Sequence, residues 1–366
     1  MKSSHRRSGF RLEGTQRLAM AKIDDVARLA GVSKGTVSNV FSQKRPTSKQ
    51  VTERVLQASK ALNYVPNHIA RSLVTKKTMA IGLTIPHGNF FFSAFHNQFI
   101  NGVVLEASRF GYRVLLDMLP VLEVKTPSLA SYPIDGAIVL GPTEEDERIH
   151  LLDQSEIPFV TVGKIFNSRV KDAPTVNNDN ARIVHDICDY LIARGHANLM
   201  FLNAADRMTV STERKAAFIE ALAKHRLVMR EWMHHCKPHI QSEQYLHYGY
   251  AETIRVIRES GERVTAIIAD DDRVAFNAMK AIKDLGLRIP EDISLFVICG
   301  DLSMMRQTMP PLTGMDLQPS ELGAQSVKLL MHKLGSNKGY YPDHMIVASK
   351  IVEGASCSAI EGEWSS

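Results

Sequence analysis

The sequence lacks any long apolar run. No stretch of about 18 apolar residues occurs among its 366 residues, which excludes a membrane-spanning helix. The first twenty residues carry five Lys and Arg side chains, but no apolar segment follows them, so a secretory signal is not expected. Cysteine is scarce, with four residues at positions 188, 236, 299 and 357 and no Cys-x-x-Cys pair. This spacing predicts neither a disulfide framework nor a zinc site, and it suits a reducing cytoplasm.

Enzyme motifs are also missing. The chain contains no Gly-x-x-x-x-Gly-Lys phosphate loop and no nucleophile elbow. The acidic run Asp270–Asp272 could hold a metal ion, but one acidic run is weak support for an enzyme. We therefore expect no catalytic residue, no metal and no cofactor. A soluble small-molecule binding protein without a regulatory role remains the alternative to the interpretation developed below.

The composition is that of an ordinary globular protein. Apolar residues make up 44% of the chain and charged residues 23%, which excludes a fibrous protein and a wholly disordered one. At about 150 residues per domain, the length predicts two or three domains.

Charge is distributed unevenly along the chain. Residues 1–78 contain 16 Lys and Arg against 4 Asp and Glu, whereas the remainder contains 28 basic and 35 acidic residues. A basic segment attached to an acidic body favours a polyanionic partner, because neutralising phosphates releases counterions. Charge alone is equally compatible with a basic solvated tail.

The basic segment is predicted to form three short helices. The first helix spans Ile23 to Ala30 and has two acids in its first turn. Gly31 then supplies a left-handed turn, and Ser33 caps a second helix from Lys34 to about Phe41. Ser48 caps a third helix that ends near Leu62. Val37 and Val40 recur at the spacing of one buried face, which leaves the small and polar residues of the second helix outside. This order is typical of a helix-turn-helix, although a small bundle that merely packs has the same pattern.

Three segments carry a specific resemblance to LacI-type transcriptional regulators, the family of the lactose and purine repressors. The run from Lys22 to Phe41 resembles the DNA-binding headpiece, and the segments 62–67 and 69–73 resemble the connection to the hinge helix. The resemblance implies that Met20 is the usual start and that residues 1–19 are an extension. It further implies a DNA-binding domain over 20–66 and a hinge over 67–78.

The resemblance assigns roles to residues of the headpiece. Lys34, Gly35 and Asn39 would read base edges, and Ser33, Thr36 and Ser38 would contact phosphates. Residues 67–75 would form a hinge helix only on DNA, with Ala70 near the minor-groove floor and Leu73 wedged between base pairs. An ordinary core position is the alternative for Leu73.

Beyond residue 79 the sequence alternates apolar strands with patterned helices, which predicts parallel α/β sheets covered on both faces. About 290 residues exceed one comfortable sheet, so we expect two lobes with a ligand cleft at the carboxyl ends of the strands. The predicted strands are 80–85, 113–116, 137–140, 159–162, 199–202, 264–268 and 293–297, and the predicted helices are 180–194, 211–225, 248–260, 274–285 and 321–334.

This body resembles the effector-binding domain of the same family, which is similar to periplasmic sugar-binding proteins. The matching phrases are Ile134–Val139, Asp179–Asn180, Arg214 with Phe218, Thr265–Ile268, Ile289–Ser294 and Pro310–Thr313. The resemblance implies a two-lobed domain for effector binding and dimerisation over 79–353, followed by a C-terminal tail over 354–366. It implies an effector site that contains Arg214, Asp272 and the aromatic residues Phe91 and Phe92.

Two departures from the family pattern bear on the effector. The family usually has Gly-Phe-Asp-Asp after the strand at 296–297, but this chain places Cys299 at the first acid and Asp301 beyond it. Either Asp301 substitutes for that acid, or the effector lacks the hydroxyl pattern that the acid reads. Three prolines also interrupt residues 120–133, where a crossover helix is expected. The sequence thus predicts a cytoplasmic, homodimeric repressor of operator DNA under allosteric control by a small molecule, for which a carbohydrate is the expected class. The tail shows no leucine heptad, so a tetramer-forming helix is not expected.

Overall fold

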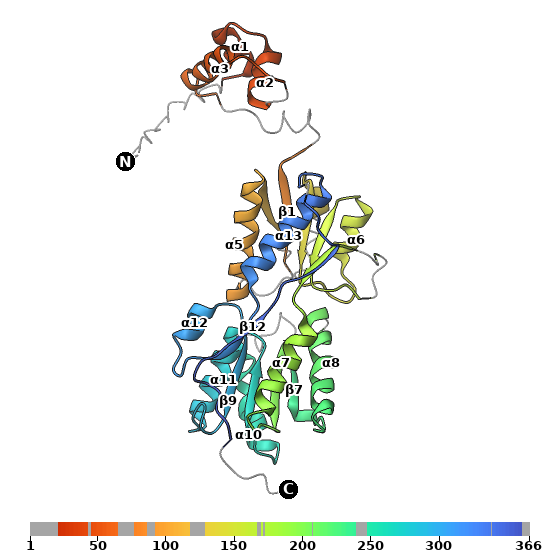
Figure 1. Cartoon of the computed structure of the whole chain (residues 1–366), viewed down its shortest axis with the longest axis vertical. Helices are drawn as coiled ribbons and strands as arrows, with labels where there is room; N and C mark the ends of the chain where they lie inside the picture. Colours follow the sequence, from red (N-terminus) through yellow and green to blue (C-terminus); the bar gives the residue numbers. More distant parts are fainter. Residues whose placement is uncertain are drawn as a thin grey trace, which may run out of the picture. The chain divides into compact units, whose positions relative to one another are not determined.

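The computed structural model describes residues 21–42, 45–64, 77–85, 92–117, 129–166, 170, 173–206, 208–238, 247–337 and 339–360. The chain divides into two compact units, Met1–Lys76 and Lys77–Ser366 (Figure 1). Among the described residues, no helix is long and apolar enough to cross a membrane.

The N-terminal unit contains three short helices, α1 (Ile23–Ala30), α2 (Lys34–Ser42) and α3 (Lys49–Ala61), as the sequence predicts. Gly31 takes a φ of 63°, the left-handed conformation that ends α1. The hydroxyl of Ser33 accepts a hydrogen bond from the N–H of Thr36 (3.1 Å), and the hydroxyl of Ser48 accepts one from the N–H of Val51 (3.4 Å). A small apolar core holds the helices together, formed by Val26, Ala27, Ala30, Val37, Val40, Val55 and Ala58.

The second unit contains two parallel α/β lobes. In the N-terminal lobe six described strands run in the order β11-β5-β4-β3-β1-β2, and every neighbouring pair is parallel. Their bounds are β1 (Ala80–Thr84), β2 (Arg113–Asp117), β3 (Gly136–Leu140), β4 (Phe159–Val162), β5 (Thr175–Asn177) and β11 (His344–Ile346).

The C-terminal lobe has the order β12-β10-β9-β8-β6-β7 among its described strands. Its pairs are parallel except for β10 with β12, which is antiparallel. The bounds are β6 (Leu199–Ala205), β7 (His234–Lys237), β8 (Ala266–Ala269), β9 (Ser294–Cys299), β10 (Thr313–Asp316) and β12 (Lys350–Val352).

Helices cover both faces of each sheet, which explains why the central strands are apolar throughout. In the N-terminal lobe, α5 (Ala94–Arg109) and α13 (Pro319–Lys333) share one core, while α6 (Glu147–Gln154) packs on the other with the short 3₁₀ turn η1 (Leu129–Ser131). In the C-terminal lobe, α7 (Asn180–Ile192) and α8 (Thr209–Lys224) cover one face and α10 (Tyr250–Glu259) and α11 (Asp272–Asp284) the other (Figure 1). The remaining short elements are η2 (Glu231–Met233) and α12 (Leu302–Arg306).

All seven predicted strands and all five predicted body helices are present, and their ends differ from the predicted ones by at most three residues. The sequence missed α5, α6 and α12, and it missed β5, β7, β10, β11 and β12. These strands have three or four residues, and β7 reads His-His-Cys-Lys, so neither length nor apolar pattern distinguishes them from loops.

The chain passes between the two lobes three times, after β5, after β10 and between β11 and β12. Asn178 lies buried at the first crossing. Its side-chain amide nitrogen donates to the carbonyl of Leu317 (3.1 Å) in the second crossing and to that of Val347 (2.9 Å) in the third. One side chain therefore ties together all three connections between the lobes.

Candidate functional site

One face of α2, together with the residue before it, is exposed to solvent. Ser33, Lys34, Gly35 and Ser38 are exposed, and Thr36 and Asn39 are partly exposed. Val37 and Val40 of the same helix are buried in the headpiece core, so the amphipathic pattern fixes which face is presented to solvent. This arrangement brings together all six residues of the headpiece that the sequence analysis assigned to DNA.

Lys34 has an ion-pair partner in the free protein. Its Nζ lies 3.2 Å from Oδ2 of Asp24 on α1, and both side chains are more than half exposed. An exposed pair of this kind stabilises a protein by only about 0–1 kcal/mol, so the lysine can leave it for another anion at little cost. The hinge residues Ala70 and Leu73, and also Phe91, lie outside the described residues.

A cavity of about 200 Å³ lies between the two lobes of the second unit. Its lining comes from the segments that follow the carboxyl ends of strands in both sheets, which is where ligands bind in parallel α/β folds. Apolar side chains supply part of the wall, and the charged lining residues are Arg214, Lys237, Asp270, Asp271 and Arg273.

Arg214 projects from α8 into this cavity and is buried. Its Nε donates to Oδ1 of Asn180 (3.2 Å), and the amide nitrogen of Asn180 donates to Oε2 of Glu213 (2.9 Å). Burial lowers the pKa of the Arg214 guanidinium from its usual value, although nearby carboxylates partly oppose that effect. The hydrogen bond through Nε orients the planar end of the side chain.

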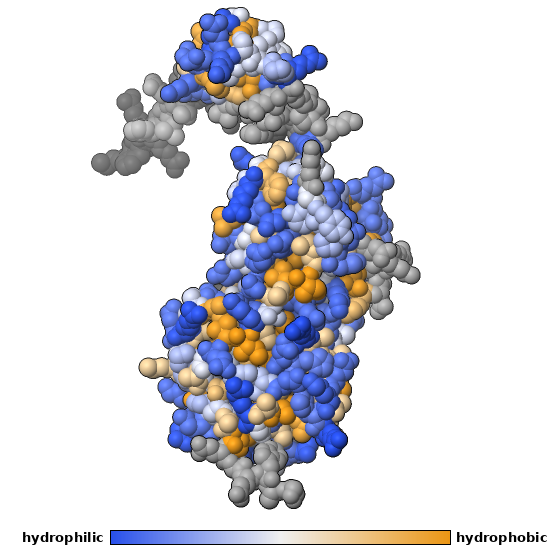
Figure 2. Space-filling view, viewed as in Figure 1, coloured by the Kyte–Doolittle hydropathy of each residue, from blue (hydrophilic) through white to orange (hydrophobic). Residues whose placement is uncertain are grey.

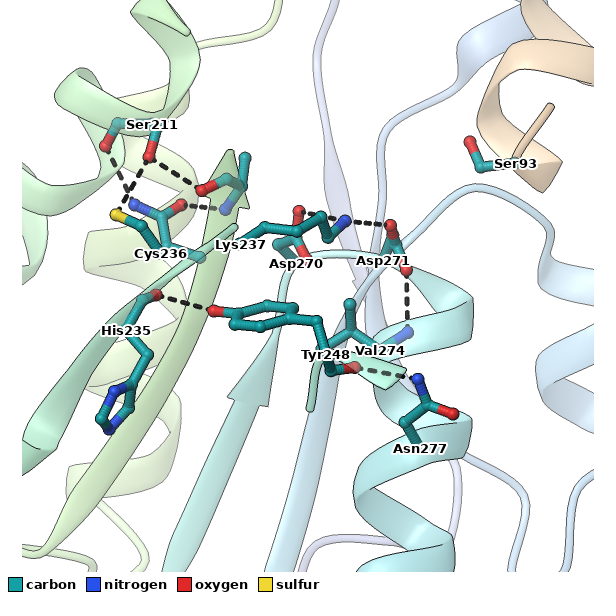
Figure 3. A network of polar contacts seen from close by, with 12 residues as sticks. Ser93, Ser211, His235, Cys236, Lys237, Tyr248, Asp270, Asp271, Val274 and Asn277 are labelled. Atoms are coloured by element: carbon teal, nitrogen blue, oxygen red, sulfur yellow. Dashed lines mark hydrogen bonds and ion pairs between the residues drawn. The ribbon is translucent and has the colours of Figure 1, made fainter. Parts of the chain in front are cut away.

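A buried lysine lies between two aspartates (Figure 3), and all three line the same cavity as Arg214. Nζ of Lys237 is 2.6 Å from Oδ2 of Asp271 and 3.3 Å from Oδ2 of Asp270. Asp271 also caps α11, where its Oδ1 accepts from the N–H of Val274 (2.8 Å). Burial raises the pKa of Asp270 to about 6, partly offset by the charge of Lys237. Burial also acts on Asp271, but Lys237 and the cap hold the pKa of that carboxyl below its usual range.

Asp272 is not part of the cavity lining, in contrast to the sequence-based expectation. It is the first residue of α11, and its two carboxylate oxygens accept from the N–H of Gly300 at 3.1 and 3.4 Å. Asp301 also lies outside the lining. It caps the short helix α12, and its Oδ1 accepts from the N–H (2.8 Å) and hydroxyl (2.7 Å) of Ser303. Cys299 is buried in β9 and also lies outside the lining.

The aromatic side chains at the cavity are Phe95 and His96, not Phe92. Phe92 packs against the N-terminal core, with its ring 6.1 Å from that of His96. The sequence analysis missed this pair because it missed α5, whose first turn carries both residues and whose N-cap is Ser93. Burial lowers the pKa of His96 to about 4, so the ring is neutral at pH 7, and its Nδ1 lies 2.7 Å from the Ser93 hydroxyl.

Gly300 brings the two lobes into direct contact beside the cavity. A Cβ atom at this position would lie 2.4 Å from the backbone nitrogen of Phe95 in the other lobe and 2.9 Å from Oδ2 of Asp272. Only glycine fits, because real Cβ atoms do not approach backbone atoms so closely. The site needs glycine at this point for the lobes to close on the cavity as they do here.

Replacing Asp272 with asparagine is expected to raise the midpoint of thermal unfolding at pH 8, and to raise it by less at pH 5. Burial, together with the charge of Asp271, raises the pKa of Asp272 to about 7. The native state therefore binds this proton more tightly than the unfolded chain, so stability falls as pH rises from about 4 through 7. Asparagine keeps an oxygen acceptor for Gly300 without the charge.

Calorimetry at the two pH values checks this expectation, with Asp153→Asn as the control at an exposed aspartate. An equal shift of the Asp272→Asn midpoint at pH 5 and pH 8 would show that the buried charge is not responsible.

Among the described residues, no group of three or more His, Cys, Asp or Glu side chains could hold a metal ion. In the run Asp270–Asp272, the first carboxylate pairs with Lys237, the second caps α11, and the third accepts a hydrogen bond from a backbone amide. The four cysteines are all free thiols.

Comparison with known proteins agrees with both units. The pattern of the family described as bacterial regulatory proteins, lacI family, matches residues 22–67, and that of the periplasmic binding protein-like domain matches residues 188–357. The transcriptional regulator MalR of Streptococcus pneumoniae serotype 4 is 27% identical over 90% of this chain and 98% of its own length. The transcriptional repressor PurR of Vibrio atlanticus is 29% identical over 86% of this chain and 92% of its own length.

Solved structures share the fold. The lac repressor dimer bound to operator and the anti-inducer ONPF has a TM-score of 0.77 at 22% identity and covers 93% of this chain and 99% of its own. The complex of the regulator CelR with cellobiose has a TM-score of 0.69 at 23% identity, with 92% of this chain and 99% of its own covered. The sequence relatives are transcriptional regulators, not enzymes, and they favour a regulatory role over that of a plain binding protein. The chain is therefore a DNA-binding transcriptional regulator that belongs to the LacI family.

Proposed function

We propose that this regulator is a repressor that binds a near-palindromic operator as a homodimer and is controlled by a small molecule in the inter-lobe cavity. The observation that carries the proposal is the exposed polar face of α2, which stands on a basic three-helix unit of the LacI type. The second unit supplies a cavity of about 200 Å³ in which a ligand would contact both lobes. A ligand with different affinities for two arrangements of the lobes would then shift operator binding.

The first turn of α2 would read the operator. Lys34, Gly35 and Asn39 would meet base edges in the major groove, and Ser33, Thr36 and Ser38 would contact phosphates. Exposure of this face and the positive end of the helix dipole support that orientation. Ala70 and Leu73 would enter the minor groove from a hinge over residues 67–78, which follows a DNA-binding domain over 20–66 and precedes an effector domain over 79–353. A protein that acts on operator DNA would work in the cytoplasm.

An apolar surface of the N-terminal lobe supports the dimer. Val104 and Leu105 of α5 are about half exposed, and Leu115 and Leu116 lie on β2, the edge strand of the sheet. The visible face of the second unit is otherwise largely hydrophilic, with separate apolar patches (Figure 2). A second copy that covers these side chains would place two copies of α2 on the two half-sites of a palindrome.

A sugar or sugar derivative is the ligand class that the cavity favours. Its wall combines apolar side chains with the planar guanidinium of Arg214 and the carboxylate of Asp270, groups that suit a polyhydroxylated molecule. The CelR structure named above is a complex with cellobiose, which agrees with this class.

Lys34→Ala is expected to change operator preference at one base pair of each half-site, by about 1–3 kcal/mol, if the side chain reads a base. The loss of its pair with Asp24 contributes little, because that pair is exposed. Gel shifts on operators substituted at each position measure the effect, with Lys60→Ala on α3 as the control. Uniform weakening at every position would mean that Lys34 contacts phosphate only.

The proposed function itself is tested by selecting binding sites from random duplex DNA with the full chain at moderate salt. We expect a near-palindrome whose affinity changes when the cavity is filled. A protein that prefers no duplex over random DNA would refute the proposal.

A further inference from the structure

The cavity contains buried polar atoms that have no hydrogen-bond partner among the described residues. Asp270 is 8% exposed, and its Oδ1 makes no hydrogen bond with the described residues, while Oδ2 of the same group pairs with Lys237. Asn177, 7% exposed, lines the cavity from the opposite lobe, and its Nδ2 donor is also unpartnered. Leaving such groups unsatisfied in a dry site is unfavourable, so each indicates an atom that a ligand supplies.

Arg214 lacks a carboxylate partner of its own. The described residues place no ion pair on its guanidinium, whose one hydrogen bond there is made by Nε to the neutral amide of Asn180. The neighbouring acids are already engaged: Glu213 pairs with Lys164 (2.6 Å), and Asp270 and Asp271 share Lys237. The terminal nitrogens of a buried arginine at a cavity wall form a planar fork that matches a carboxylate.

The charges of the lining residues also favour an anionic ligand. Among the described residues that line the cavity, three are cations, Arg214, Lys237 and Arg273, and two are anions, Asp270 and Asp271. His96 adds no charge at pH 7. A single negative charge on the ligand would therefore make the closed cavity neutral, which lowers the cost of keeping these charges away from water.

The unpartnered atoms are mostly donors. The terminal nitrogens of Arg214 and Nδ2 of Asn177 donate, whereas Oδ1 of Asp270 is an acceptor for one hydroxyl. Each hydroxyl of a neutral sugar brings a donor together with its acceptor oxygen, whereas a carboxylate offers acceptors only. The volume of about 200 Å³ corresponds to roughly seven water molecules at ~30 Å³ each, which suits a monosaccharide-sized ligand.

We propose, on the basis of the effector control proposed above, that the effector is a sugar acid of monosaccharide size. Its carboxylate binds the guanidinium fork of Arg214, and Nδ2 of Asn177 donates to one of its oxygens. One of its hydroxyls donates to Oδ1 of Asp270, which Lys237 holds in position through Oδ2.

Sugar acids paired with neutral sugars of the same carbon skeleton test this assignment on the full chain. Gluconate with glucose, galactonate with galactose, and glucuronate and galacturonate with the same two sugars are compared by isothermal calorimetry. At least one acid is expected to bind roughly 10- to 100-fold more tightly than its neutral partner, since a charged hydrogen bond distinguishes them. Raising the salt from 0.05 to 0.5 M should change this ratio little, because the site is buried.

Arg214→Gln should bring the ratio of acid to neutral affinity close to one, whereas Arg182→Gln, an exposed arginine of α7, should leave it unchanged. The comparison on the wild-type chain is decisive even if the Arg214 variant does not fold. Tighter binding of neutral sugars, or no binding by any of these acids, would overturn the inference. Glucose 6-phosphate and ribose 5-phosphate form a separate arm, and a phosphate that binds more tightly than every acid would overturn the carboxylate assignment.

The same ligands separate this inference from the proposed function. An acid that binds with the expected preference but leaves operator affinity unchanged would support the ligand class and refute effector control. Operator affinity that responds to a neutral sugar alone would support effector control and refute the sugar-acid ligand class.

Discussion

Lys237→Met is expected to lower the free energy of unfolding of the second unit by about 3–5 kcal/mol at pH 8. The lysine side chain is 5% exposed, and its ammonium group forms ion pairs with two buried carboxylates, those of Asp270 and Asp271. Methionine fills a similar volume but removes the charge that pairs with both acids. Removing one partner of a buried pair costs more than the pair contributes, because the remaining charge stays out of water.

The loss should be smaller at pH 5 than at pH 8. Burial already raises the pKa of Asp270 to about 6. The charge of Lys237 lowers the pKa of both carboxyls, so its removal is expected to raise both. A raised pKa in the folded state means that the native protein binds more protons than the unfolded chain, so its stability falls as pH rises. At pH 5 the variant can neutralise its acids by protonation, whereas at pH 8 it cannot.

Urea denaturation at the two pH values measures the effect, and Lys224→Met is the matched control. Nζ of Lys224 lies 2.7 Å from Asp189, nearly the distance of Lys237 from Asp271, but that side chain is 55% exposed. An exposed pair contributes about 0–1 kcal/mol, so the control should lose little. A Lys237→Met protein within 1 kcal/mol of wild type, or with the same loss at both pH values, would show that the three charges are not coupled as described.

Arg214→Ala is expected to abolish the ligand response while operator binding stays intact. The guanidinium lines the cavity, and loss of a charged hydrogen bond removes about 1.5–3 kcal/mol, or roughly 10- to 150-fold, of ligand affinity. DNA affinity without ligand should not change, because the headpiece is a separate compact unit with its own apolar core.

Calorimetry with the tightest ligand of the sugar and sugar-acid panel measures the first effect, and a gel shift on the selected operator measures the second. Arg182→Ala is the control, since that arginine is 76% exposed and its weak partner is Asp186, 3.6 Å away. Unchanged ligand affinity would remove Arg214 from the site. Lost DNA binding would mean that the variant disturbs more than the cavity.

Local chemistry in the sequence determined the headpiece almost residue by residue. Helix α1 begins at Ile23 and ends at Ala30 as predicted, and Ser33 and Ser48 cap the next two helices. These features are predictable because capping hydroxyls and a left-handed glycine act on their immediate neighbours in the sequence. The central strands of the second unit are also predictable from the sequence, because a strand that is buried on both faces is a continuous apolar run. Arg214 was identified as a cavity residue by its resemblance to the family motif, and the structure places it in the lining.

Tertiary structure decided the rest of the cavity, because its residues are distant in sequence and meet only when the sheets form. Lys237 ends a strand that reads His-His-Cys-Lys, and nothing local marks it as the cation that joins Asp270 and Asp271. Of three consecutive aspartates, the backbone direction after β8 sends two to the cavity and turns Asp272 to Gly300. Periodicity in the sequence specifies helices and strands, whereas the environment of a charge depends on which segments pack around it.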